Sequence, residues 1–180
     1  SYLGDGAANQ GQVYETFNMS ALWKLPIIFV IENNQYGMGT SVSRAAAGQD
    51  FADRGKSYGI PGYQIDGMDV LAVRAAAREA LDYCRSGKGP YILEMKTYRY
   101  RGHSMSDPAK YRTRDEVDAM RKQHDPIEQL RDLLLREGGD EAGLKQIDQK
   151  VKAVVTDAAD FALTSPEPNT DELFTDILIA

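Results

Sequence analysis

The chain has 180 residues, which is enough for one domain with a sizeable hydrophobic core. Its apolar share of 42% and charged share of 27% are ordinary for a globular protein, and its formal net charge of −6 argues against a general nucleic-acid-binding protein. No stretch approaches the roughly 20 apolar residues of a membrane-spanning helix. The single cysteine, Cys84, cannot form an internal disulfide, so we expect a structural residue in a reducing compartment.

The first part of the chain predicts alternating strands and helices. The apolar runs, helical spacings and Gly or Pro stops predict a strand at 2–3, a helix at 8–22, a buried strand at 27–31, a Gly-rich connection at 35–49, a short helix at 51–58, a strand at 63–65, a helix at 70–85 capped by Asp69, and a strand at 91–98. This alternation implies right-handed crossovers and a parallel sheet. The predicted fold class is therefore α/β, with a doubly wound parallel sheet.

The second part of the chain has a different character. A polar, basic loop at 99–114 follows the last predicted strand, and helices are expected at about 115–124, at 126–137 with a proline in the first turn, and at 141–163 with one apolar face. A last short segment is expected at 171–178. We therefore predict an α/β domain at 1–114, which includes the basic loop, and a helical C-terminal extension at 115–180.

Two short motifs follow two of the predicted strands. Gly4-Asp5-Gly6 comes after the first strand, and Asn33-Asn34 comes after the strand at 27–31. Ligands of open α/β sheets bind at the carboxyl ends of the strands, where Asp5 and Asn34 would each offer an oxygen. Such oxygens suit Mg²⁺ or Ca²⁺, and small residues followed by a helix start near Ala8 suit a phosphate. The residues alone therefore predict a metal-bridged diphosphate site.

The spacing of these motifs resembles a known signature. Gly-Asp-Gly followed about thirty residues later by Asn-Asn is similar to the thiamine-diphosphate motif. The surrounding sequence resembles the thiamine-diphosphate-dependent 2-oxo acid dehydrogenase family over two stretches, GDGAANQGQVYETFNMSALWKLP and ENNQYGMGTSVSRAA. Within this family it most closely resembles the α subunits of the decarboxylating component of pyruvate dehydrogenase complexes. The resemblance runs from Ser1 almost without a break, so we expect the chain to be a C-terminal fragment of such a subunit.

The resemblance implies roles for individual residues. Asp5, the Asn34 side-chain oxygen and the Tyr36 carbonyl oxygen would ligate Mg²⁺, and Arg99 would contact the diphosphate as a permanently charged partner. His103 would also contact the diphosphate, line the channel used by the lipoyl group and serve as the catalytic residue. The cofactor-binding set that the resemblance implies is Gly4, Asp5, Gly6, Ala7, Asn34, Tyr36, Arg99 and His103.

The same resemblance implies an activity and partners. The activity is the thiamine-diphosphate- and Mg²⁺-dependent oxidative decarboxylation of pyruvate with reductive acetylation of a lipoyl group. The partners are a β subunit in an α₂β₂ heterotetramer and the lipoyl domain of the dihydrolipoyl acetyltransferase component. Ser104 matches a serine that a dedicated kinase phosphorylates in mitochondrial members, but the loop is one residue shorter and Lys110 precedes Tyr111. These sequence differences favour a bacterial, cytoplasmic protein over the alternative, a protein of the mitochondrial matrix.

Three other interpretations stay open at this point. The chain could come from the α subunit of a branched-chain 2-oxo acid or acetoin dehydrogenase, which shares the metal motif. It could be a non-catalytic α/β nucleotide-binding module that uses the same metal–diphosphate chemistry. It could also have a purely structural role, with the long helix from Glu141 making subunit contacts. Fold analogy alone does not choose among these interpretations, whereas the extended motif favours the pyruvate enzymes.

Overall fold

The computed structural model describes residues 1–176 and divides into two compact units. The first unit covers Ser1–Leu130, and the second covers the described residues from Arg131 onward. All the predicted site residues lie in the first unit. The domain boundary predicted at residue 114 stays a prediction.

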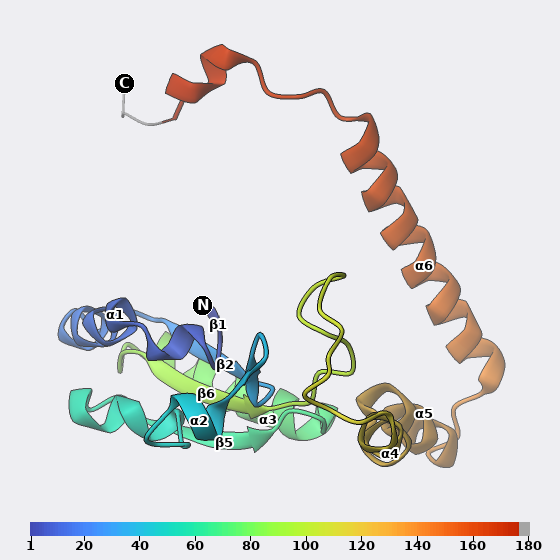
Figure 1. The fold of residues 1–180 in the computed structure, drawn as a ribbon, viewed down its shortest axis with the longest axis horizontal. Helices are drawn as coiled ribbons and strands as arrows, with labels where there is room; N and C mark the ends of the chain where they lie inside the picture. Colours follow the sequence, from blue (N-terminus) through green and yellow to red (C-terminus); the bar gives the residue numbers. More distant parts are fainter. Residues whose placement is uncertain (177–180) are drawn as a thin grey trace. The chain divides into compact units, whose positions relative to one another are not determined.

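The first unit is built on a parallel four-stranded sheet (Figure 1). Its strands lie in the order β1 (Tyr2–Gly4), β2 (Ile28–Asn33), β6 (Tyr91–Lys96) and β5 (Gly62–Asp66). Gly4 pairs with Glu32, and Asn33 pairs with Lys96, so the carboxyl ends of β1, β2 and β6 share one edge. The predicted parallel sheet is confirmed, although β6 ends two residues before the predicted strand does.

Helices and 3₁₀ turns connect these strands, and two further helices follow the last strand. They are η1 (Ala7–Asn9), α1 (Gly11–Leu22), α2 (Val42–Ala45), η2 (Ala52–Tyr58), α3 (Val70–Arg85), α4 (Arg114–His124) and α5 (Pro126–Arg136). The predicted cap of α3 is confirmed, because the Asp69 carboxylate accepts from the backbone N–H groups of Leu71 and Ala72 at 2.9 and 3.0 Å. Pro126 begins α5, as its missing N–H group allows.

The start of α1 differs from the prediction. A continuous helix was expected from Ala8, but Ala7–Asn9 form a 3₁₀ turn and α1 begins at Gly11. Gln10 between them is extended, with φ −75° and ψ 142°, and its carbonyl oxygen accepts from the Val13 N–H group at 3.1 Å. Helical periodicity at Val13 and Phe17 could not reveal this break, because both residues lie beyond it.

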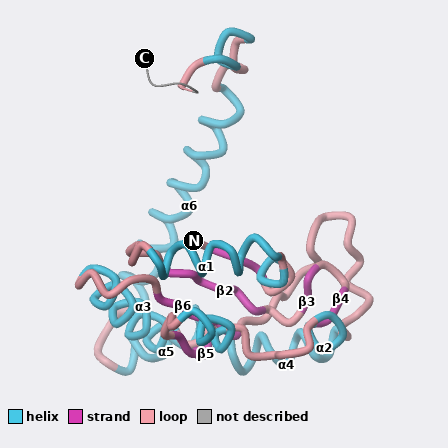
Figure 2. Tube along the Cα trace, turned by 90° about the vertical axis from the view of Figure 1, so that its left-hand side faces the viewer, coloured by secondary structure: helices cyan, strands magenta, loops and turns pink. Residues whose placement is uncertain are grey.

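The Gly-rich connection after β2 also has more structure than its composition indicates. Tyr36–Gly37 (β3) and Thr40–Ser41 (β4) form a small antiparallel pair, which α2 follows directly. Figure 2 shows this pair beyond the end of β2 and beside α2. The connection therefore holds a defined hairpin at the edge of the sheet where the predicted ligands lie.

The sheet has a hydrophobic core on each face. Phe29 and Ile31 of β2 belong to one core, which includes Phe17 of α1 and residues of η2. Ile28 and Val30 point to the opposite face and pack against the second core, which α3 supplies with Ala76, Ala80 and Cys84. This alternation is the period of two expected for a strand, and it places α1 and α3 on opposite faces (Figure 1).

Cys84 has the structural role predicted for it. Its side chain is 4% exposed in the core beneath α3, and its thiol lies 3.6 Å from the Ile27 carbonyl oxygen. Burial raises the pKa of this thiol. A buried, protonated thiol is a poor nucleophile, so its contribution is packing.

We expect Ile31→Val to destabilise the protein modestly. Ile31 is fully buried in the core that holds α1 against the sheet. Removing one methylene group from such a site costs about 0.5–1.5 kcal/mol of unfolding free energy. Thermal unfolding of the purified protein, followed by circular dichroism, should show the midpoint falling by roughly 2–4 °C. An unchanged midpoint would contradict the core packing described above.

The described part of the second unit contains the end of α5 from Arg131, one long helix and one 3₁₀ turn. Helix α6 (Glu141–Thr164) confirms the predicted helix and is capped by Asp140, whose carboxylate accepts from the Gly143 N–H group at 2.8 Å. Its apolar side chains Val151 and Phe161 are exposed. The final segment, predicted at 171–178, overlaps η3 (Thr170–Phe174), and residues 177–178 of that prediction lie outside the described residues. Within residues 1–176, no helix is both long and apolar enough to cross a membrane.

Candidate functional site

The two predicted motifs meet at the carboxyl edge of the sheet. Because β1 and β2 are parallel neighbours, the turn after Gly4 and the hairpin after Asn33 leave the sheet side by side. A Cβ atom built on Gly37 would lie 3.3 Å from the Gly6 Cα atom and 4.0 Å from the Asp5 Oδ2 atom. The backbones are thus in direct contact, and a bulky residue at position 37 would force them apart.

Asp5 is the buried carboxylate of this edge. Its side chain is 3% exposed, and it forms no ion pair within 4.0 Å among residues 1–176. Burial raises the pKa of this carboxyl, and the backbone N–H groups of Asp5 and Asn34 and the charges of Arg99 and Lys96 oppose that shift. A buried carboxylate without a direct counter-ion is a group that a bound cation would neutralise.

The hairpin places the Asn34 N–H group and Gly37 next to this carboxylate, and Tyr36 lies between these two residues in the chain. The Asn34 Oδ1 atom accepts from the Tyr36 N–H group at 3.3 Å, which bends the chain back at the end of β2. The Tyr36 ring packs on Tyr111, with ring centroids 4.7 Å apart. Packing fixes the ring, while the backbone carbonyl group of Tyr36 is the part that the family resemblance implies as a ligand.

Small residues form the turn after Asp5. Gly4 ends β1, Gly6 precedes η1, and Ala7 is its first residue. The Arg54 guanidinium of η2 donates to the Ala8 carbonyl oxygen at 2.8 Å and so ties the turn to the rest of the unit. The backbone of this turn is open to a ligand at Gly6, which is exposed.

The basic loop brings the predicted Arg99 and His103 together. The Arg99 Nη1 and His103 Nδ1 atoms lie 3.3 Å apart. Asp107 organises the loop, because its carboxylate accepts from the His103 N–H group at 2.7 Å, the Ala109 N–H group at 2.9 Å and the Tyr111 hydroxyl at 2.8 Å. These hydrogen bonds, led by the one from His103, lower the pKa of Asp107. The described contacts of His103 are therefore with its own loop.

Two residues that received no role in the sequence analysis join the loop to the hairpin. Tyr111 stacks on Tyr36, and the Arg112 guanidinium lies 5.0 Å from the Tyr111 ring and 5.6 Å from the Tyr36 ring. Arg112 is 9% exposed and also donates to the Arg101 carbonyl oxygen at 3.0 Å. The sequence Tyr111-Arg112 carried part of this signal, since arginine stacks readily on aromatic rings.

A buried polar pair behind the hairpin was also missed. Asn33 and Glu94 are both fully buried, and the Asn33 Nδ2 atom donates to the Glu94 Oε1 atom at 2.7 Å. Glu94 stands between Leu93 and Met95 in a buried strand. A lone carboxylate in an otherwise apolar strand is a signal of a specific polar role, because a buried charge needs partners.

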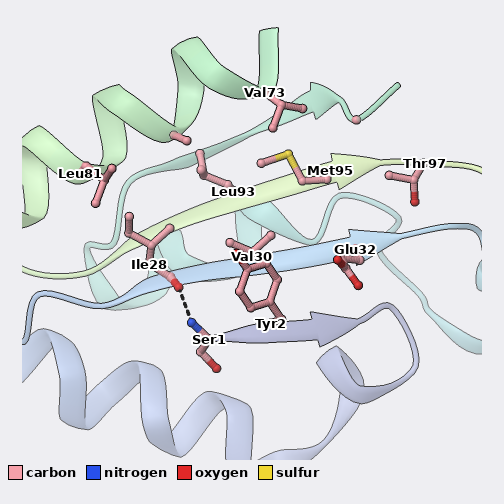
Figure 3. A pocket seen from close by; sticks show the side chains of 12 residues that line it. Ser1, Tyr2, Ile28, Val30, Glu32, Val73, Leu81, Leu93, Met95 and Thr97 are labelled. Atoms are coloured by element: carbon pink, nitrogen blue, oxygen red, sulfur yellow. Dashed lines mark hydrogen bonds between the residues drawn. The ribbon is translucent and has the colours of Figure 1, made fainter. Parts of the chain in front are cut away.

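A pocket of about 450 Å³ lies elsewhere, on the face of the sheet that α3 covers (Figure 3). Its lining includes Val73 and Leu81 of α3 and Ile28 and Val30 of β2, and it is mostly apolar. The pocket contains none of the predicted site residues. It is therefore separate from the candidate site at the sheet edge.

The donor set at the sheet edge fits a magnesium ion. It offers one carboxylate, one carboxamide oxygen and one backbone carbonyl group, and Mg²⁺ takes few protein ligands and completes its shell with phosphate and water. Among residues 1–176, no group of three or more His, Cys, Asp or Glu side chains could hold a metal ion. The described part of the chain therefore shows no zinc-type cluster.

Comparison with known proteins agrees with this geometry. The sequence matches the family described as the dehydrogenase E1 component over residues 1–171. It is 67% identical over 180 residues to the pyruvate dehydrogenase E1 component subunit alpha of Rhizobium meliloti and 58% identical over 179 residues to that of Zymomonas mobilis. It is 56% identical over 172 residues to the somatic mitochondrial form of Homo sapiens.

These relatives are longer than the chain. The alignments cover 99%, 99% and 94% of the chain, but only 52%, 51% and 44% of the respective relatives. The chain thus spans about half the length of the curated relatives it matches. Since the family match covers nearly the whole sequence, the chain belongs to the dehydrogenase E1 component family.

Proposed function

We propose that the chain is part of the α subunit of a pyruvate dehydrogenase. In this role it takes part in the thiamine-diphosphate- and Mg²⁺-dependent oxidative decarboxylation of pyruvate and the reductive acetylation of a lipoyl group, which feeds acetyl-CoA synthesis after glycolysis. The relatives named as pyruvate dehydrogenase subunits support this assignment. The α subunit of a branched-chain 2-oxo acid or acetoin dehydrogenase is the alternative.

The main support for this proposal is that the Gly4-Asp5-Gly6 and Asn33-Asn34 motifs lie side by side at one edge of the sheet. Residues about thirty positions apart form one edge site, where Gly37 touches Gly6 and the buried Asp5 carboxylate faces the hairpin. One buried oxyanion, one amide oxygen and close glycine backbones are what a Mg²⁺ ion bridging to a diphosphate requires. An ordinary turn gives no reason to bury a carboxylate without a counter-ion.

Each residue of this edge has a proposed role. Asp5, the Asn34 side-chain oxygen and the Tyr36 carbonyl oxygen hold Mg²⁺, while Gly4, Gly6 and Ala7 let backbone N–H groups approach the diphosphate. Arg99 adds positive charge on the same side, as its effect on the pKa of Asp5 indicates. His103, held next to Arg99, contacts the diphosphate and lines the path of the lipoyl group. Thiamine diphosphate, when bound, supplies the electron sink for decarboxylation.

The proposal extends to the fold and to the assembly. The sheet with α1 and α3 on opposite faces is consistent with the doubly wound thiamine-diphosphate-binding fold, with the α/β domain at 1–114 and the helical extension at 115–180. A β subunit would complete an α₂β₂ heterotetramer, and the lipoyl domain of a dihydrolipoyl acetyltransferase would receive the acetyl group. A bacterial cytoplasm is the proposed location, with the mitochondrial matrix as the alternative.

The test is a substrate panel with the complete α subunit co-expressed with its β partner. Reduction of an artificial electron acceptor would be followed with pyruvate, 2-oxobutyrate, 2-oxoisovalerate and acetoin, each with and without thiamine diphosphate and Mg²⁺. We expect turnover that requires both cofactors and has its highest kcat/KM with pyruvate. A preference for 2-oxoisovalerate or acetoin would establish the alternative, and turnover without thiamine diphosphate would refute the proposal.

A further inference from the structure

Glu94 lies at the centre of a polar network in the middle of the sheet. Its Oε2 atom accepts from the N–H groups of Phe51 and Ala52 at 2.7 and 3.0 Å and from the Gln64 side chain at 3.1 Å. Its Oε1 atom accepts from the Asn33 Nδ2 atom at 2.7 Å, with the Lys96 ammonium 3.7 Å away. All five neighbouring groups are donors, so Glu94 acts as a hydrogen-bond acceptor only.

This network determines the orientation of the Asn33 amide group. An amide has one donating and one accepting end, and its orientation follows from its partners. With Glu94 accepting on one side, the Asn33 Nδ2 atom must face it, and the Oδ1 atom must face the other way. There the Oδ1 atom accepts from both the backbone N–H group and the side-chain Nε2 atom of Gln35, at 3.1 and 2.9 Å.

The two hydrogen bonds between Gln35 and the Asn33 Oδ1 atom stabilise an unusual backbone conformation of Gln35. Gln35 has φ +74°, in the left-handed region that side chains with a Cβ atom rarely adopt. Such a backbone persists only where its surroundings hold it. The two hydrogen bonds from Gln35 to Asn33 hold it from both its main chain and its side chain. Gln35 stands between Asn34 and Tyr36, so its conformation sets where both of these residues point.

We infer that Glu94 is a positioning residue for the metal site. It orients the Asn33 amide, which holds Gln35 in its left-handed conformation and so places the two ligating oxygens of Asn34 and Tyr36. This inference rests on the proposed function, because that proposal names Asn34 and Tyr36 as Mg²⁺ ligands. Glu94 itself touches neither of them and acts through Asn33.

The inference predicts that each single substitution weakens metal binding and that the paired substitution restores it. In Glu94→Gln, the three donors on the Oε2 side keep the remaining oxygen there, so the new NH₂ group faces the Asn33 NH₂ group. The Asn33 amide must then turn over and present donors to Gln35. In Asn33→Asp, two carboxylates face each other. In the double variant Glu94→Gln/Asn33→Asp, the new Gln amide can donate to the new Asp, whose other oxygen can still accept from Gln35. The donor and acceptor pattern is restored with the partners exchanged.

The experiment measures Mg²⁺ binding in the complete α subunit co-purified with its β partner. Calorimetric titration with thiamine diphosphate at several Mg²⁺ concentrations gives the metal affinity, and Mn²⁺ binding followed by electron paramagnetic resonance checks it independently of turnover. We expect each single variant to bind the metal about 10–100-fold more weakly, as for other residues that orient metal ligands. The double variant should return to within roughly threefold of the wild type, since its hydrogen-bonding pattern is complete.

Gln64→Met is the matched control. It removes the Gln64 hydrogen bond to Glu94 but leaves the Asn33 contact in place, so metal affinity should stay within about twofold of the wild type. Wild-type affinity in Glu94→Gln would overturn the inference. So would a double variant that binds no better than Asn33→Asp, a comparison that remains available if Glu94→Gln fails to fold. Absence of Mg²⁺-dependent binding in the wild type would instead refute the proposed function.

Discussion

Asp5→Asn should abolish Mg²⁺-dependent binding of thiamine diphosphate while making the empty protein more stable. The substitution keeps the shape of the side chain and removes the charge that neutralises the cation. Charge stabilisation by a bound metal ion is worth several kcal/mol, so we expect catalytic turnover to fall by about a thousandfold or more. Calorimetry with thiamine diphosphate and Mg²⁺ should detect no metal-dependent binding.

The gain in stability follows from the raised pKa of Asp5. Burial raises this pKa above its ordinary value of 3.8, so the folded protein holds the proton more tightly than the unfolded chain. The stability that the protonated group contributes is complete below pH 3.8 and is lost as the pH rises through the folded pKa. At neutral pH, the wild type therefore carries an unfavourable buried charge that Asp5→Asn lacks.

The check is thermal unfolding of both proteins without metal or cofactor over a series of pH values. Asp5→Asn should have the higher midpoint at pH 7, and the difference should shrink as the pH is lowered toward 3.8. Added Mg²⁺ and thiamine diphosphate should raise the midpoint of the wild type alone. A variant that is less stable at pH 7, or that still gains stability from the cofactors, would contradict the assignment of Asp5.

Gly102→Ala should disable the basic loop without unfolding the rest of the protein. A Cβ atom at Gly102 would overlap the Asp107 carbonyl oxygen and lie 2.9 Å from its Cβ and Cγ atoms. Backbone cannot give way as a flexible side chain does, so Asp107 must move and release the N–H group of His103. We expect kcat/KM for pyruvate to fall by about 10–100-fold, the loss typical of misplaced catalytic groups.

Gly48→Ala, in the connection between α2 and η2, is the control for this substitution. Nothing lies within 4 Å of a Cβ atom at Gly48, so activity should remain that of the wild type. The midpoint of thermal unfolding should be close to the wild-type value in both variants, because the basic loop adds little to the hydrophobic cores. Full activity in Gly102→Ala would show that the turn at Asp107 does not matter for turnover.

Local sequence signals predicted the elements of the first unit well. The apolar run at 27–31, the Asp69 cap and Pro126 each depend on neighbouring residues, and the structure confirms all three. The break at Gln10 and the hairpin at Tyr36 were missed. Both depend on where the chain must go after leaving the sheet, which hydrophobic periodicity does not encode.

The candidate site was only partly predictable for a related reason. Asp5 and Asn34 could be paired because they follow strands, and the parallel sheet then brings their loops together. The roles of Glu94 and Tyr111 depend on contacts between distant parts of the chain. No periodic pattern in the sequence predicts such contacts. The carboxylate of Glu94 in a buried strand and the tyrosine beside Arg112 nevertheless indicated a specific role.

The distance along the chain between Asn33 and Glu94 also bears on synthesis and folding. These residues are 61 positions apart, and β6 must pair with β2 before they can meet. When only the first motif and the hairpin have emerged from the ribosome, the chain therefore still lacks Glu94, the acceptor that orients the hairpin through Asn33. Non-local contacts of this kind form late, because closing a long loop costs entropy before the contact forms. We therefore expect the proposed cofactor site to be completed only after β6 has joined the sheet.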